Sequence, residues 1–109
     1  MKSTLIADKD QSQLVIVDVQ TKLVSVMPDA ASSVIKNCAT LLQAASLLEV
    51  PEVYTEQYPK GLGNTTPELL SLLADKHPIE KTTFSCCAES TFTRFLSSDR
   101  SHIVLAGME

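Results

Sequence analysis

An unbroken apolar run at residues 14–17 is the feature that most constrains the fold of this chain. Its sequence is Leu-Val-Ile-Val, mostly β-branched, and it ends at Asp18. A strand with one face in water alternates apolar and polar residues, so an unbroken run indicates a strand that is covered on both faces, as in a parallel sheet. Asp18 would then lie at the C-terminal end of that strand.

The segments that follow alternate between helix and strand patterns. Residues 29–49 place apolar side chains three or four positions apart, which predicts a helix of about five turns with one buried face, ended by Pro51. Pro67 marks the start of a short helix. The remaining predicted elements are strands at 52–56, 77–85 (the weakest) and 102–106 (buried), and a helix at 88–98 that buries Phe92, Phe95 and Leu96.

This regular alternation predicts an α/β fold, in which right-handed crossovers build a parallel sheet, and the length of 109 residues suits one domain, 1–109. A doubly wound sheet binds its ligands beyond the C-terminal ends of its strands. Asp18, the loop around Glu56, Lys81 and Glu109 all fall at such ends, so we expect the functional site there.

Composition excludes several classes of partner. The net charge is −4 and the nine Lys and Arg are scattered, so we expect no nucleic-acid partner. No apolar run is long enough to cross a bilayer, and the N-terminus is too polar for a signal peptide, which predicts a cytoplasmic protein without membrane contact. The cysteines are odd in number, and we expect reduced thiols at Cys38, Cys86 and Cys87.

Four separated motifs resemble the isochorismatase-like cysteine hydrolases. They are "LVIVDVQ", "YTEQYPKGLGNTTPELL", "IEKTTFSC" and "HIVLAGME", and together they cover essentially the whole chain. The resemblance implies a three-layer fold around a parallel sheet with strand order 3-2-1-4-5-6, of which strands 1–4 fall within these 109 residues. It also implies hydrolysis of a small-molecule amide, imide or vinyl ether by a protein that commonly assembles as a homo-oligomer.

The family's catalytic set is an Asp, a Lys and a Cys, and the resemblance assigns the first two to Asp18 and Lys81. The Cys has no counterpart up to Glu109, so we expect a C-terminally truncated hydrolase domain that is inactive in amide hydrolysis. A thiol becomes a good nucleophile only when a base or a cation favours the thiolate. The Asp can move that proton, and the Lys offsets the cost of burying the charge. Members that cleave vinyl ethers do not always need the Cys.

Further residues are candidates for the substrate pocket because of their places beside strand ends. They are Gln20, Tyr58, Phe84 and Glu109. Glu56 and Gln57 either hold the loop over the pocket or contact a neighbouring subunit. The loop at 55–67 contains no His, and the two histidines lack ligand spacing, so we expect neither zinc nor another cofactor.

Each assignment has a plainer alternative. Asp18 could be only a polar strand terminus, and Lys81 a solvated surface lysine. Cys86 and Cys87 are expected to behave as small hydrophobic residues rather than as the nucleophile. For the whole chain the alternative is a non-catalytic interaction module that self-associates through the sheet edge left bare beside the fourth strand.

Overall fold

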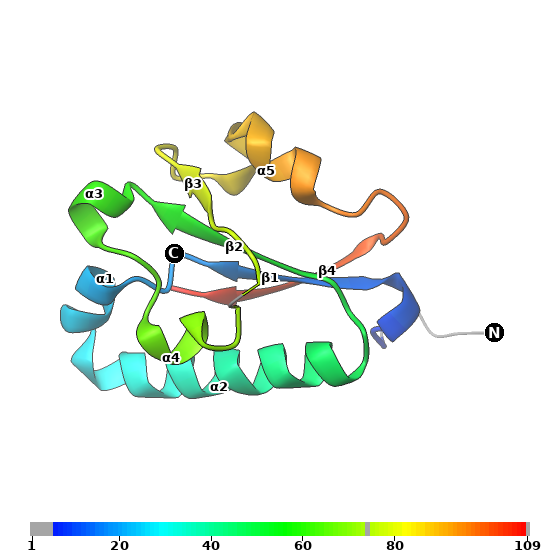
Figure 1. The fold of residues 1–109 in the computed structure, drawn as a ribbon, viewed down its shortest axis with the longest axis horizontal. Coiled ribbons are helices and arrows are strands. Elements are labelled where there is room, and N and C mark those ends of the chain that lie inside the picture. The colour runs from blue at the N-terminus through cyan, green and yellow to red at the C-terminus, as the bar shows by residue number, and fades with distance from the viewer. Residues whose placement is uncertain (1–5, 74, 109) are drawn as a thin grey trace.

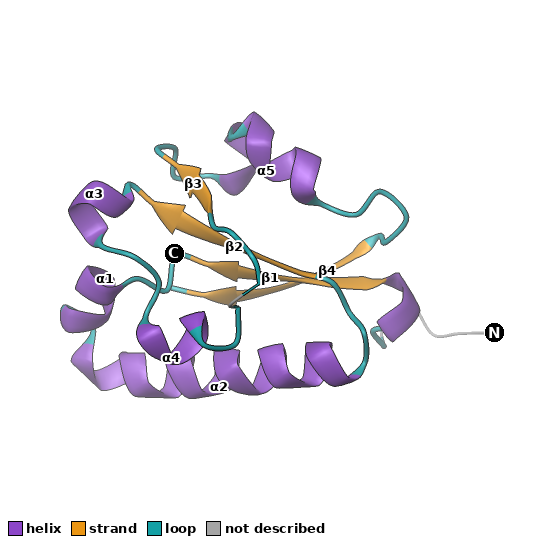
Figure 2. Ribbon diagram, viewed as in Figure 1, coloured by secondary structure: helices purple, strands orange, loops and turns teal. Residues whose placement is uncertain are grey.

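The computed structural model describes residues 6–73 and 75–108, and its centre is a parallel sheet (Figures 1 and 2). Its four strands lie in the order β3-β2-β1-β4, and every pairing between neighbours is parallel. The predicted α/β class and the order of the first four family strands are therefore confirmed. The strands are β1 (Ser12–Val17), β2 (Glu52–Gln57), β3 (Ile79–Lys81) and β4 (His102–Gly107).

Helices cover both faces of the sheet, which makes three layers. Figure 1 shows α1, α2 and α4 on one side of the sheet and α5 on the other. The sequence predicts the long helix α2 and the short helices α4 and α5, whereas α1 and α3 are too brief to show a helical period. The α-helices are α1 (Thr21–Ser25), α2 (Pro28–Leu47), α3 (Pro59–Leu62), α4 (Pro67–Leu70) and α5 (Ser90–Phe95), and the 3₁₀ helices are η1 (Lys9–Gln11) and η2 (Cys86–Ala88). No described helix is long and apolar enough to span a bilayer.

The first strand, β1, is buried along its whole length, as its apolar run predicts. Leu14 and Ile16 join a cluster with the apolar stripe of α2, including Cys38, while Val15 and Val17 join a second cluster on the opposite face. Successive side chains of a strand point to opposite faces, so a run without polar positions suits a strand between two helical layers.

The last strand, β4, is not the buried strand that its sequence predicts. Ile103 and Leu105 are 47% and 67% exposed, whereas the alternate side chains, Val104 and Ala106, are half-buried against the α2 layer. The reason is position, because β4 lies at the edge of the described sheet and pairs only with β1. The predicted burial of Phe95 is also wrong, since α5 buries Phe92 and leaves Phe95 60% exposed. A helix of six residues presents only one face to the sheet.

Candidate active site

Asp18 is the first residue after β1, and its backbone adopts the left-handed conformation with φ +56°. Asp tolerates this region better than most residues, but its use at a buried position is uncommon and is typical of functional sites. Gly107, opposite Val17, permits the adjacent close approach of β4, because a Cβ there would lie 2.1 Å from the carbonyl oxygen of Val17. The chain around Asp18 is thus tightly held.

The side chains of Asp18 and Lys81 form a fully buried ion pair. Lys81 Nζ lies 2.8 Å from Asp18 Oδ2, and both side chains are 0% exposed. They come from the C-terminal ends of β1 and β3, with β2 between these strands. The sequence places both residues at this edge, and the structure brings them into direct contact.

Neighbouring oxygens and a hydroxyl make further hydrogen bonds to this pair. Lys81 Nζ donates to Gln57 Oε1 at 2.7 Å and to the carbonyl oxygens of Thr83 and Phe84, each at 3.3 Å. Thr55 Oγ1 donates to the other carboxylate oxygen, Asp18 Oδ1, at 2.7 Å. Burying two charges costs several kcal/mol per ion unless such bonds replace the lost water, so these contacts allow the pair to exist in the interior.

Two of these partners, Thr55 and Gln57, are not identified as partners of the pair by the sequence analysis. Both lie at the C-terminal end of β2, the same criterion that selects Asp18 and Lys81. The signal that could have found Thr55 is register, because Thr55 pairs with Val17, the residue directly before Asp18. That register depends on packing and cannot be read from the segment itself.

Gln20 and Glu56 hold the loop that follows β2 rather than pointing into open space. Gln20 is fully buried. Its amide oxygen accepts a hydrogen bond from the backbone N–H of Gln57, and its amide nitrogen donates to the carbonyl oxygens of Gln57 and Gly63. Glu56 accepts hydrogen bonds from the backbone and the hydroxyl of Thr65 at 2.7 and 2.9 Å. Of the two roles considered for Glu56, the structure therefore supports the one in which it holds the loop.

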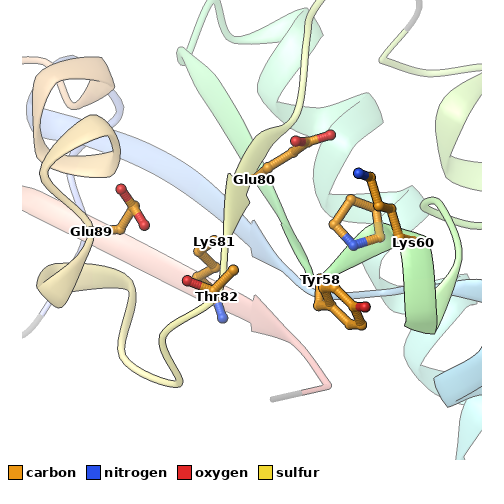
Figure 3. Close-up of a pocket in the computed structure, with 7 residues that line it drawn as sticks. Tyr58, Lys60, Glu80, Lys81, Thr82 and Glu89 are labelled. Carbon is orange, nitrogen blue, oxygen red and sulfur yellow. The ribbon is translucent and has the colours of Figure 1, made fainter.

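A cavity of about 360 Å³ lies beside the C-terminal end of β3 and is lined by Lys81 of the pair (Figure 3). Tyr58, which has φ +38°, contributes an exposed ring to this cavity. Lys81 lines the cavity and Asp18 does not, so the cavity lies next to the ion pair and does not open onto the carboxylate. Phe84 is exposed and lies outside the lining; its carbonyl oxygen accepts a hydrogen bond from Lys81 Nζ. Glu109 lies outside the described residues.

Among the thiols, Cys86 interacts with the ion pair. The charges of Lys81 and Asp18 and the side chain of Thr55 all influence the pKa of its thiol. Burial is the largest influence and raises the pKa of the Cys86 thiol, the nearby lysine opposes this, and the carboxylate reinforces it. The thiol is therefore protonated near neutral pH. Within the described residues, no group of three or more His, Cys, Asp or Glu is arranged to hold a metal ion.

A three-layer parallel α/β fold with a buried Asp–Lys pair at the C-terminal strand edge defines the class of this protein. The sequence profile of the isochorismatase domain matches residues 12–109. The chain belongs to the isochorismatase family, whose members are hydrolases, as the four motifs predict.

Several known proteins are similar to this chain. The chain is 43% identical over 79 residues to isochorismatase domain-containing protein 2 of Danio rerio. The matched segment covers 72% of this chain and 39% of the relative. The MAR1 ribonuclease of Caenorhabditis elegans is 36% identical in sequence, with a TM-score of 0.83 over 94% of this chain and 53% of that one. The YcaC gene product of Escherichia coli, an octameric hydrolase of unknown specificity, shares the fold at 22% identity and a TM-score of 0.80, over 99% of this chain and 55% of that one. The chain thus spans about half the length of these proteins or less.

Proposed function

We propose that this chain carries the Asp–Lys part of a hydrolase site that acts on a small amide, imide or vinyl ether. Asp18 transfers the proton, and Lys81 stabilises the negative charge of the site. The observation that carries the proposal is the fully buried contact of 2.8 Å between Lys81 Nζ and Asp18 Oδ2, at the sheet edge where parallel α/β proteins bind ligands.

The carboxylate oxygens of Asp18 can accept further hydrogen bonds. Each carboxylate oxygen accepts about two hydrogen bonds, and the described contacts of Asp18 supply one to each oxygen, from Thr55 and from Lys81. We propose that the remaining lone pairs of Asp18 accept an acidic proton of a thiol or a substrate while both contacts stay in place. General acid–base catalysis by such a residue accelerates a reaction by roughly 10²- to 10⁴-fold.

We further propose that the nucleophilic thiol of amide hydrolysis comes from outside these 109 residues. Burial raises the pKa of Cys38 in the helical layer, and it also raises that of Cys86, so neither supplies a thiolate readily. Cys87 is exposed to solvent, and none of the described hydrogen bonds of Asp18 or Lys81 involves it. Residues 1–109 on their own are then inactive towards amides.

A chimera tests this assignment. Residues 1–109 are joined to the C-terminal part of the Danio rerio relative, and hydrolysis of a panel of small amides, imides and vinyl ethers is measured. Asp18→Asn should lower turnover by about 100-fold or more, whereas Asp29→Asn, on the exposed start of α2, should not. A chimera that is active and keeps its rate with Asn at position 18 would disprove the role of Asp18, and amide turnover by the unjoined chain would disprove its inactivity.

RNA belongs in the same panel, because one similar structure is a ribonuclease. We propose that RNA is not the substrate of this chain. The cation of the ion pair, Lys81, is already bonded to Asp18, and the net charge of −4 repels phosphates. Salt-dependent RNA binding or cleavage, lost with Lys81→Met, would overturn this choice of substrate class.

The exposed face of β4 favours a second function, a self-associating interaction module. Ile103, Leu105 and Phe95 are large apolar side chains left in solvent, and the outer edge of β4 is unpaired within residues 6–73 and 75–108. The octameric assembly of the YcaC hydrolase adds support for a homo-oligomer. Light scattering should then give a multiple of 11.8 kDa, reduced to the monomer by Leu105→Lys. A monomeric wild-type chain would exclude this function.

A further inference from the structure

Gln57 makes the shortest contact with the Lys81 ammonium. The distance from Lys81 Nζ to Gln57 Oε1 is 2.7 Å, against 2.8 Å to Asp18 and 3.3 Å to each of the two backbone carbonyls. An ammonium group has three protons. Asp18 and Gln57 each accept one of them, and the two longer carbonyl contacts share the third.

The backbone of Gln57 is itself fixed at the end of β2. Gln57 N donates to Gln20 Oε1 at 2.7 Å, and Gln20 Nε2 donates to the carbonyl oxygens of Gln57 at 2.9 Å and of Gly63 at 2.7 Å. The next residue, Tyr58, donates its N–H to the carbonyl oxygen of Lys81 at 2.9 Å. Gln57 is therefore held by Gln20, in the segment after β1, and by its pairing with Lys81 of β3.

We propose that Gln57 is a positioning residue that keeps the Lys81 ammonium on Asp18 Oδ2. Its amide oxygen satisfies a buried proton without adding charge, so Asp18 remains the sole anion bonded to Lys81 among the described residues. Through the amide of Gln20, the same contact links the conformation of the loop at residues 58–63 to the ion pair. This inference deepens the proposed function, on which its catalytic meaning rests.

The test observes the ammonium itself, by NMR measurement of proton exchange at ¹⁵Nζ of Lys81 in the 109-residue chain. A hydrogen bond to a charged group contributes enough to slow exchange by about tenfold or more. Gln57→Met keeps the length of the side chain but lacks the acceptor, and should speed exchange by that factor. Gln57→Glu keeps an acceptor oxygen and should preserve slow exchange, as should Gln43→Met, the matched control on the exposed face of α2.

Unchanged exchange in Gln57→Met would overturn the inference, since Asp18 would then hold the ammonium without help. Equal acceleration in Gln57→Met and Gln57→Glu would also overturn it, and so would matching acceleration of the backbone amides of β1, which indicates general loosening. The exchange test does not depend on turnover. A failed hydrolase assay with a positive exchange result would therefore refute the proposed function and leave the positioning role intact.

Discussion

Replacement of Lys81 by Met should destabilise the chain strongly, because it leaves the Asp18 carboxylate buried without its cation. Both side chains are fully buried and 2.8 Å apart. Removing one partner of such a pair costs about 3–5 kcal/mol, mainly because the remaining charge stays out of water. A domain has a total stability of about 5–15 kcal/mol, so the loss is a large fraction of it.

Urea unfolding of four proteins measures the effect: the wild-type chain, Lys81→Met, Asp18→Asn and the double variant. The double variant removes both charges, and its loss should be smaller than the sum of the two single losses by at least about 1 kcal/mol. Lys36→Met, on the exposed face of α2, should change stability by no more than about 0.5 kcal/mol. A loss below about 1 kcal/mol for Lys81→Met, or strictly additive losses, would refute the reasoning.

Three further predictions concern other parts of the chain. Gly107→Ala should cost about 1–3 kcal/mol in urea unfolding, because φ is +143° and the new Cβ meets the backbone of Val17; a neutral effect would contradict the close approach. Glu52→Gln should raise Tm at pH 8 but not at pH 4. Burial raises the pKa of Glu52, so the folded chain binds this proton more tightly than the unfolded chain does. The stability that the proton contributes is fully present below the ordinary glutamate pKa and is lost as the pH rises through the raised pKa. Iodoacetamide should modify Cys86 about tenfold more slowly than the exposed Cys87, as read by mass spectrometry; equal rates would mean that burial does not protect Cys86.

Much of the fold follows from local patterns in the sequence. The unbroken run at residues 14–17 predicts the central strand, and the helical period after Pro28 predicts α2. Apolar spacing and Pro positions report the tendency of one segment to be buried and its backbone conformation, so they predict the strands, the helices other than α1 and α3, and the parallel class of the sheet. They also place Asp18 and Lys81 at one edge of the sheet.

Only the tertiary structure decides the partners at that edge. Asp18 and Lys81 are 63 residues apart, and their contact, together with those of Thr55 and Gln57, depends on strand register. The same cause explains the wrong expectation for β4. An apolar run shows that a strand can be buried, but whether Leu105 is covered depends on which elements lie beside it. Local sequence carries the tendency of a segment, and packing between distant segments determines its neighbours.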